Sequence, residues 1–587
     1  KMNTTVDGEF QKYAVESGAY IREHFFGPDP RLRKLVEHLS DEELQALPRG
    51  GHDYRKLYAA YKAAVENEGN PTAILAKTIK GWTLGPEIEA RNATHQIKKM
   101  SKAQLVALRD RLFLQEEIPD EALDAELPPY YRPPEDSPAH EYLMERRRRL
   151  GGSLPKRRVR AKPLPSPQDQ VFAELKRGSG TQAVSTTMAF ARLLRGLVRD
   201  PGVGRRIVPI IPDEARTFGL DALFKEVKIY ASTGQLYTPV DADLLLSYSE
   251  SRSGQILEEG ITEAGAMASF TAAATSYATW GEPTIPMFAF YSMFGFQRVG
   301  DLIWALGDIR GRGFLLGCTA GRTTLAGEGL QHCDGHSHVL ASTVPNLSAY
   351  DPAFAYELAT IVSDGIRRMY GPEPEDRFYY LTLYNENYQM PPLPEGEEGL
   401  RVTEGILKGM YRFSGPPEGA EPKRRASIWF SGPMWRAAAE AQRLLAEEWD
   451  VAADTWSVTS YKALREEALS VERRNRLHPA EPPLVPYVSR MAQSCEGPVV
   501  AVTDFMKAVP DQVARWVPHQ FIPLGTDGFG RSDTREALRR HFEVDAAHVV
   551  VAALHGLALS GEAKAEEVAE AISRYGIDPE LPDPRVA

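Results

Sequence analysis

The chain has 587 residues, of which 43% are hydrophobic and 25% charged, and its formal net charge is −11. This length exceeds one hydrophobic core and predicts about three or four domains, while the acidic balance argues against a general nucleic-acid-binding protein. No apolar run of about 18 residues occurs and the opening KMNTTVDGEF lacks a signal-type apolar core, so we expect no membrane span and no secretion.

The cysteine content also indicates the cellular compartment. Three cysteines, Cys318, Cys333 and Cys495, are too few for a disulfide framework and favour a reducing, cytoplasmic location. The chain opens on Lys1 with no initiator before it, which we interpret as a start inside a longer polypeptide. Neither a GxGxxG fingerprint nor a GxxxxGK[ST] loop is present, so the two commonest nucleotide-binding motifs have no support.

The first region runs to about residue 150. DYRKLYAAYKAAVENEG (53–69) predicts a helix, and TAILAKTIKGW (72–82) predicts a strand. A stretch rich in proline, glycine and arginine follows at 146–168 and predicts a linker, which we place at 151–168. Its positive charge could bind phosphate or nucleic acid, but a solvated linker is the preferred interpretation.

The second region, 169–392, alternates short apolar strands with helices. This alternation predicts an α/β fold with a parallel sheet covered by helices on both faces, in which ligands bind beyond the carboxyl ends of the strands. The predicted strands are 207–211, 285–291, 313–318, 346–350 and 378–383.

One helix of this region starts at an acid. After Glu263 the segment to Ala278 is almost entirely small or apolar, which predicts a tightly packed, buried helix. Burying an unpaired carboxylate costs several kcal/mol. Glu263 therefore either benefits from the positive end of the helix dipole or meets a polar group that is not protein.

Polar and aromatic residues gather after two of the strands. Asp213 and Glu214 follow the first strand, where they could form a reacting centre, an intersubunit ion pair or a helix start. YSMFGFQRVGD follows the second and places Tyr291, Phe294 and Phe296 together, as core or as a cofactor contact.

A long glycine-rich loop follows the third strand and carries Glu328, His332, Asp334, His336 and His338. The histidines lack the helical spacing of a zinc site, so general acid–base work or substrate binding is preferred over a metal. No GxSxG elbow or catalytic-cysteine motif occurs. This set of side chains without a strong nucleophile indicates that a cofactor performs the difficult step.

The third region, 393–587, starts the strand–helix pattern again. ASIWFSG, the helix MWRAAAEAQRLLAEEW and the strand VAADTWSV are followed by the apolar segments GPVVAVTD and HVVVAALHGLAL. The region therefore predicts a third, smaller α/β domain.

Several strings resemble one family. PDEARTFGL, GQILEEGITEAGA, FYSMFGFQRVGD, GRTTLAGEGLQHCDGHSH and LGTDGFGRSDTREALRRHFEVD are similar to the homodimeric bacterial type of pyruvate dehydrogenase decarboxylase component, in the thiamine-diphosphate-dependent transketolase-like superfamily. GAYIREHFFG, PRGGHDYRKLYAAY and KTIKGW extend the likeness through the first region, so it covers essentially the whole chain.

The resemblance implies a transketolase-like architecture. Residues 1–150 match the C-terminal part of a diphosphate-binding domain, 169–392 a pyrimidine-binding domain and 393–587 a C-terminal domain. The family binds thiamine diphosphate and Mg²⁺ through Gly-Asp-Gly and a later Asn, and no Gly-Asp-Gly occurs in this chain. We therefore expect no metal ligand here and assign the metal and diphosphate ligands to a missing upstream half.

The resemblance also implies roles for named residues. Glu263 matches the acid that contacts the pyrimidine ring of the cofactor, and Ile261, Tyr291 and Phe294 match other contacts to that ring. Residues at the reacting centre or the substrate are matched by His332, Asp213, Glu214, Glu328 and Lys80. His95 matches a histidine on a mobile loop that closes over the site and assists acetyl transfer.

The reaction implied is decarboxylation of pyruvate followed by reductive acetylation of the lipoyl group of a dihydrolipoamide acetyltransferase, performed by a homodimer. A sister enzyme for another 2-oxo acid, or a transketolase, is an alternative. The missing Gly-Asp-Gly also leaves open a catalytically incomplete fragment or dimerisation module.

Overall fold

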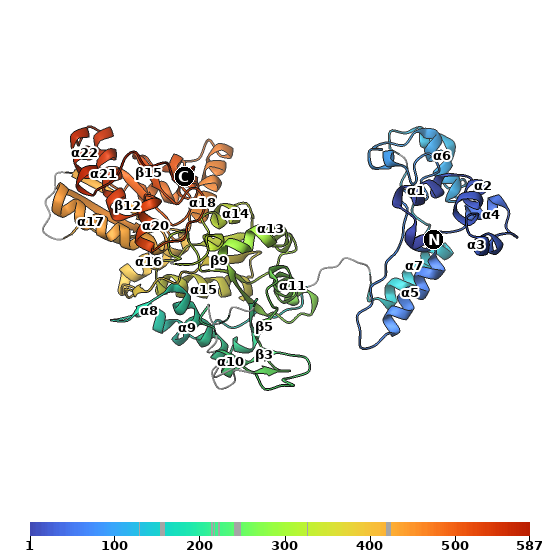
Figure 1. Ribbon diagram of the computed structural model, residues 1–587, viewed down its shortest axis with the longest axis horizontal. Helices are drawn as coiled ribbons and strands as arrows, with labels where there is room; N and C mark the ends of the chain where they lie inside the picture. The colour runs from blue at the N-terminus through green and yellow to red at the C-terminus, as the bar shows by residue number, and fades with distance from the viewer. Residues whose placement is uncertain are drawn as a thin grey trace. The chain divides into compact units, whose positions relative to one another are not determined.

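The computed structural model describes residues 1–587 except 128, 153–158, 213–214, 216–217, 221–222, 240–247, 326 and 418–423. The chain divides into two compact units, Lys1–Lys156 and Arg157–Ala587 (Figure 1). Each unit is described by itself below.

The first unit is built from helices, and its described residues contain no strand. Its longest helix, α5 (Tyr54–Glu66), confirms the helix predicted there, and Asp53 begins it by accepting the backbone N–H groups of Arg55 and Lys56. The other helices are η1 (Met2–Thr4), α1 (Asp7–Val15), α2 (Gly18–Ile21), η2 (Arg22–Phe26), α3 (Pro30–Leu35), α4 (Asp41–Ala46), η3 (Gly50–His52), η4 (Asn92–His95), α6 (Lys102–Arg111), η5 (Asp120–Asp124) and α7 (Pro138–Arg149).

The strand predicted at 72–82 is wrong. Residues 71–79 have no regular secondary structure and pair with no strand among the described residues, and Leu75 is 96% exposed. A strand needs a neighbour to satisfy its backbone, so an apolar, β-prone sequence alone does not make one. The basic run that opens the predicted linker also differs from expectation, because Arg146–Arg149 form the last turn of α7.

A six-stranded sheet forms the centre of the second unit, with the order β5-β2-β6-β7-β9-β8 and every pair parallel. The five predicted strands are confirmed as β2 (Ile207–Ile211), β6 (Ile285–Tyr291), β7 (Phe314–Cys318), β8 (Leu347–Tyr350) and β9 (Phe378–Thr382), and β5 (Leu257–Glu258) was not predicted. The strands β6, β7, β8 and β9 are almost wholly buried, as expected for strands covered on both faces.

Helices cover both faces of this sheet. On one face, α11 (Glu263–Ala274) and α13 (Ser292–Asp308) pack over β6, and α14 (Ser337–Ala341) packs against α13. On the other, α15 (Ala355–Tyr370) packs with α8 (Gln170–Lys176) and α9 (Thr186–Arg199). The predicted parallel α/β layer is therefore confirmed. Short elements complete it: β1 (Ala183–Val184), η6 (Gly204–Arg206), α10 (Phe224–Val227), β3 (Ile229–Tyr230), β4 (Glu250–Ser251), α12 (Ser276–Thr279), η8 (Leu330–His332) and β10 (Tyr388–Gln389).

Helix α11 is less buried than its composition predicts. Ala266, Met267 and Phe270 face the core, but the stripe Ala264, Ala268 and Ala272 is exposed. An alanine-rich helix has no polar face to distinguish water from protein, so the sequence alone could not reveal this half-exposure.

The C-terminal part carries a five-stranded sheet with the order β11-β13-β12-β14-β15, antiparallel only between β11 and β13. The segment HVVVAALHGLAL is helical and lies in α21, whereas GPVVAVTD contains strand β14. The elements are α16 (Gly396–Lys408), β11 (Tyr411–Ser414), β12 (Arg424–Phe430), η9 (Gly432–Met434), α17 (Trp435–Trp449), β13 (Val451–Ser457), α18 (Tyr461–Leu477), α19 (Tyr487–Ala492), β14 (Val499–Val502), η10 (Pro510–Trp516), β15 (Phe521–Leu524), α20 (Arg535–His541), α21 (Ala546–Leu559) and α22 (Ala565–Arg574).

One stretch of the described residues, Arg535–Leu559, is long and apolar enough to cross a membrane by length and composition alone. It consists of α20 and α21, and 56% of its most apolar window is buried inside the protein. Helix α21 packs on α17 and β14, which accounts for its apolar sequence as that of a core helix.

Candidate active site

The candidate site lies at the carboxyl ends of the parallel strands in the second unit. Tyr291 is the last residue of β6, the loop that carries His332 follows β7, and Glu263 begins α11 shortly after β5. Parallel strands end at the same edge of a sheet, so the topology gathers these side chains there.

Glu263 is the first residue of α11 and only 8% of it is exposed. Thr262 caps the helix by accepting the backbone N–H of Gly265 at 3.2 Å. The carboxylate Oε1 of Glu263 accepts a hydrogen bond from Arg298 Nη1 at 2.8 Å. Both interpretations of this acid keep support: it stands at the positive end of a helix, and it is a buried anion whose partner, Arg298, has a half-exposed side chain.

Beside this pair lies an aromatic surface. The guanidinium of Arg298 sits 4.0 Å from the ring centre of Phe294, whose ring is 5.9 Å from that of Tyr291. The imidazole of His332 contacts both rings, with centres 4.9 Å from Tyr291 and 5.3 Å from Phe294. The predicted residues Glu263, Tyr291, Phe294 and His332 therefore form one connected cluster through Arg298.

One polar atom of this cluster is left without a partner. The Nδ1 atom of His332 is buried and has no hydrogen-bond partner among the described residues. A buried ring nitrogen without a partner costs about 1–3 kcal/mol, so the position is suited to a polar ligand atom.

The loop that carries His332 is held by the C-terminal part of the chain. Arg322 donates to the carbonyl oxygens of Thr526 and Gly528, and Asp504 accepts from the backbone N–H and hydroxyl of Thr323, each at 2.8 Å. Burial raises the pKa of Asp504. Gly321, at φ +87°, has no room for a side chain, since a Cβ there would lie 2.1 Å from Asp504 Oδ2.

The other polar residues of this loop have structural partners. Asp334 is buried and accepts the N–H groups of His336 and Ser337, both at 3.0 Å, at the start of α14. His338 is buried against Phe505 and contacts Thr382 Oγ1 through Nε2 at 3.0 Å, and burial lowers its pKa. Of the three histidines, only His332 joins the cluster.

A second group of predicted residues lies in the first unit. Lys80 Nζ lies 2.6 Å from His95 Nδ1, and both residues are exposed. The N–H of Ala90 donates to the carbonyl of Lys80 at 2.9 Å, which closes the loop between them. The structure thus brings together two residues that are 15 positions apart in sequence and were predicted separately.

The remaining predicted residues either lie outside the described residues or belong to neither group. Asp213 and Glu214 lie outside the described residues, so their roles stay predictions. Glu328 is exposed on the His332 loop, and Ile261 is 76% exposed just before the helix cap. Phe296 packs against Tyr380 in the core at 5.0 Å and is not part of the aromatic surface.

Sequence reasoning missed Arg298 and Phe218. Arg298 lies within the quoted string YSMFGFQRVGD, four residues after Phe294, so helical spacing could have placed both on one face. Phe218, whose ring is 5.4 Å from that of Tyr291, gave no such signal because it lies some 70 residues upstream.

The cluster offers a buried carboxylate, a guanidinium, two aromatic rings and an imidazole. This donor set suits a planar, nitrogen-containing ring and an anionic substrate rather than a metal ion. Among the described residues no group of three His, Cys, Asp or Glu side chains could hold a metal.

Comparison with known proteins gives two family matches. Residues 163–391 match the pyruvate dehydrogenase E1 component middle domain, and residues 409–545 match the transketolase-like C-terminal domain. The chain is 54% identical over 579 residues to the pyruvate dehydrogenase E1 component of Mycolicibacterium smegmatis, covering 98% of this chain and 62% of that protein. It is 51% identical to that of Pseudomonas aeruginosa, covering 100% and 65%.

The chain therefore spans about three fifths to two thirds of the length of the curated relatives it matches. Among solved structures, transketolase from Leishmania mexicana matches with a TM-score of 0.53 and 15% identity, over 91% of this chain and 67% of that one. At this identity the likeness concerns the fold, which is transketolase-like.

Proposed function

Because the chain belongs to the pyruvate dehydrogenase E1 family, we propose that it serves the decarboxylation of pyruvate and the reductive acetylation of a lipoyl group in a pyruvate dehydrogenase complex. The observation that carries the proposal is the cluster in which buried Glu263 stands beside Tyr291, Phe294 and His332. Thiamine diphosphate, when bound, supplies the electron sink that decarboxylation of a 2-oxo acid requires.

The residues present fit the pyrimidine end of that cofactor. The carboxylate of Glu263 can accept a hydrogen bond from a protonated ring nitrogen, and burial makes such a bond strong because few waters compete. Tyr291 and Phe294 offer ring surfaces to a planar heterocycle. Arg298 must share or release the carboxylate for this contact to form, since it occupies Oε1 here.

His332 is the group we assign to the substrate side. Its unpartnered, buried Nδ1 can donate to or accept from a carboxylate or carbonyl oxygen, and a protonated imidazole would offset the charge of a 2-oxo acid. Asp213, Glu214 and Glu328 are proposed at the same centre on the resemblance alone.

We propose that His95 acts at the acetyl-transfer step and that Lys80 contacts the substrate, as the resemblance implies. Their close approach lets Lys80 Nζ donate a hydrogen bond to His95 Nδ1, which orients the imidazole for proton transfer. We propose that their loop closes over the site, as the resemblance implies.

The motif by which the family binds the diphosphate and Mg²⁺ is absent from this sequence. No Gly-Asp-Gly occurs in the sequence, and the described residues offer no metal-binding group. We propose, as the resemblance implies, that residues outside this sequence hold the diphosphate and the metal.

We also propose a homodimer that docks on a dihydrolipoamide acetyltransferase. The exposed stripe of Ala264, Ala268 and Ala272, with Trp280 83% exposed nearby in sequence, is apolar and suits burial against another chain. The three cysteines are all free and buried, which supports the proposed cytoplasmic location.

A substrate panel tests the proposal. The purified protein, given thiamine diphosphate and Mg²⁺, is offered pyruvate, 2-oxobutyrate, 2-oxoglutarate or xylulose 5-phosphate, with reduction of a dye as the readout. Preference for pyruvate is expected. Preference for 2-oxoglutarate or the sugar phosphate would instead establish the sister enzyme or transketolase alternative.

A catalytically incomplete fragment is the second candidate, favoured by the 62% coverage of the relative and the absent Gly-Asp-Gly. Its signature would be a folded protein that turns over none of the four substrates. Activity restored by adding a separate chain that carries the Gly-Asp-Gly motif would then show that the Glu263 cluster is functional.

A further inference from the structure

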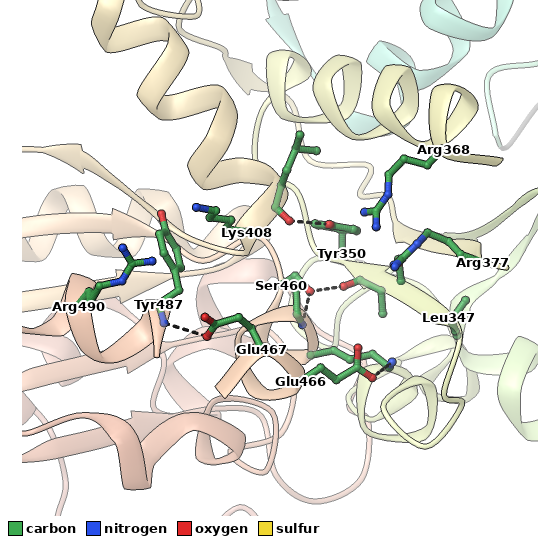
Figure 2. A pocket seen from close by; sticks show the side chains of 15 residues that line it. Leu347, Tyr350, Arg368, Arg377, Lys408, Ser460, Glu466, Glu467, Tyr487 and Arg490 are labelled. Carbon is green, nitrogen blue, oxygen red and sulfur yellow. Dashed lines mark hydrogen bonds and ion pairs between the residues drawn. The ribbon is translucent and has the colours of Figure 1, made fainter. Parts of the chain in front are cut away.

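A second pocket lies away from the candidate active site, within the second unit. It has a volume of about 320 Å³ and is lined by the edge strand β8, the end of α15, the end of α16, and the starts of α18 and α19 (Figure 2). The volume is at the lower end of the range for small-molecule sites.

Five cationic side chains line this pocket, against two carboxylates. Figure 2 shows Arg368 and Arg377 reaching into it from one side and Lys408 and Arg490 from the other. The fifth cation is Lys462, and the two acids are Glu466 and Glu467. The lining therefore carries three more positive than negative groups, and the cations come from separate elements of the fold.

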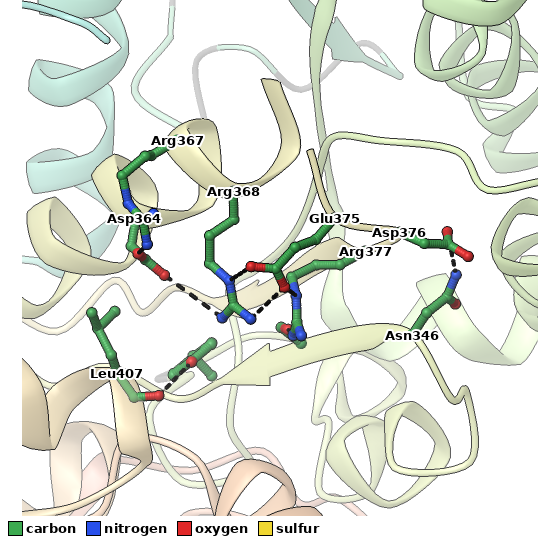
Figure 3. Close-up of polar contacts among 10 residues, drawn as sticks. Asn346, Asp364, Arg367, Arg368, Glu375, Asp376, Arg377 and Leu407 are labelled. Atoms are coloured by element: carbon green, nitrogen blue, oxygen red, sulfur yellow. Dashed lines mark hydrogen bonds and ion pairs between the residues drawn. The ribbon is translucent and has the colours of Figure 1, made fainter. Parts of the chain in front are cut away.

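The carboxylates that balance the arginines stand behind them. Glu375 accepts from Arg368 Nε at 2.7 Å and from Arg377 Nε at 3.0 Å, and it does not line the pocket (Figure 3). Asp364, 3.7 Å from Arg368, likewise stands outside the lining. The acids thus fix the two guanidinium groups side by side while leaving the pocket face of the pair free of carboxylate. Paired arginines of this kind match the oxygens of a phosphate.

Lys462 adds a buried charge. Its side chain is 4% exposed, it pairs with Glu466, and burial lowers the pKa of the ammonium group. A buried ammonium with one partly exposed partner is costly, and an anion in the pocket would offset that cost.

Lys408 and Arg490 flank one aromatic ring. The Nζ of Lys408 is 5.1 Å and the Cζ of Arg490 5.4 Å from the ring centre of Tyr487. The hydroxyl of Tyr487 donates to Met410 O at 2.9 Å, so the ring is fixed. Among the described residues no carboxylate lies within ion-pair distance of Arg490. Lys408 pairs with Glu404 at 2.5 Å, and Glu404 does not line the pocket. Arg490, without such a partner, stands beside a fixed ring and suits a ligand that carries both charge and an apolar body.

We propose that this pocket binds a small organic phosphate, with Arg368 and Arg377 on the phosphate and Tyr487, Lys408 and Arg490 on the organic body. The site is separate from the proposed decarboxylation cluster and does not depend on that function. The pocket lies between α18 of the C-terminal domain and β8, at the edge of the sheet that carries the active-site loops. A bound ligand would therefore contact both β8 and α18.

The test is calorimetric titration of the full chain with phenyl phosphate at low ionic strength. Thiamine diphosphate is left out throughout, because it is itself an organic phosphate and could occupy the pocket. A dissociation constant of about 0.1–1 mM is expected for a small fragment held by several charges. Lys408→Gln/Arg490→Gln, at two exposed positions, should weaken binding at least ~10-fold, and Arg377→Gln by a similar factor.

Matched controls come from α15 and α16, the helices that carry Arg368 and Lys408. Arg367, the residue before Arg368, pairs with Asp364 and does not line the pocket, so Arg367→Gln is one control. Arg401, an exposed cation of α16 that pairs with Glu397, gives the second control, Arg401→Gln. Both should bind phenyl phosphate as the unaltered chain does. No binding to the unaltered chain, or equal weakening by pocket and control variants, would overturn the proposal.

Discussion

The Oε1 atom of Glu263 lies 2.8 Å from Nη1 of Arg298, so the acid that begins α11 is paired with a cation that also stacks on Phe294. Glu263 is buried, whereas Arg298 has 49% of its side chain exposed. The arginine can therefore leave the carboxylate for water at small cost, while the carboxylate cannot leave the site. This asymmetry keeps the acid available to a ligand.

Removing the arginine should destabilise the fold. Arg298→Gln leaves the buried Glu263 without its cation and is expected to lower the free energy of unfolding by about 1–2 kcal/mol, reduced from the cost in a fully buried pair by exposure of the arginine. Urea unfolding measures it. The double variant Glu263→Gln/Arg298→Gln should recover part of the loss. Arg310→Gln, which breaks an exposed pair with Asp376, should change the free energy of unfolding little. An equal loss in Arg298→Gln and Arg310→Gln would refute the account.

His332 should act on pyruvate. His332→Ala is expected to lower kcat/KM for decarboxylation by ~10²-fold, because the imidazole that faces Tyr291 and Phe294 is removed. Steady-state kinetics with pyruvate measure it. His336→Ala is the control: it alters a contact with Gln297 outside the cluster and should keep the full rate. Similar losses in the two variants would place His332 among structural residues.

The first unit should serve acetyl transfer. His95→Ala is expected to leave decarboxylation unchanged and to slow lipoyl acetylation by about 10–100-fold, since it removes the partner of Lys80 and not a group of the Glu263 cluster. Dye reduction reports the first step, and mass spectrometry of an acetylated lipoyl domain reports the second. His38→Ala, at another exposed histidine of this unit, should change neither rate. Equal loss of both steps in His95→Ala would remove this assignment.

The free energy of unfolding should fall at acid pH as Glu375 becomes protonated. The hydrogen bonds from Arg368 lower the pKa of Glu375 below its ordinary value of 4.5. A carboxylate with a depressed folded-state pKa stabilises the fold above the unfolded pKa and loses this contribution as the pH falls through the folded pKa. Glu375→Gln should therefore cost about 1 kcal/mol at pH 7 for this partly exposed pair and almost nothing at the acid end. Glu373→Gln, two residues away and exposed, should show no such pH-dependent difference in urea unfolding.

Much of the second unit follows from its sequence. Strands β2, β6, β7, β8 and β9 match apolar runs because a strand buried on both faces must be apolar throughout. The same reasoning predicted a strand at 72–82 that the structure lacks, because sheet formation needs a neighbouring strand, which a sequence does not display.

The candidate site also combines residues that were predicted from the sequence with residues that were not. The resemblance singled out Glu263, Tyr291, Phe294 and His332, and the parallel topology brings them together. Arg298 was not predicted, because an arginine on a helix is usually solvated and its partner lies 35 residues away. The pairing of Lys80 with His95 arises from an irregular loop closed by backbone hydrogen bonds, for which no periodicity exists.

The most direct measurement is the release of carbon dioxide from pyruvate by the purified protein, with and without thiamine diphosphate and Mg²⁺, beside the Glu263→Gln variant. Where residues outside this sequence supply the diphosphate and metal ligands, the account predicts release that requires both additions. It also predicts that release falls about 10²-fold in Glu263→Gln, because the neutral amide is a weaker acceptor than a carboxylate for a charged hydrogen bond. Release that does not need the cofactor, or an undiminished rate in Glu263→Gln, would contradict it.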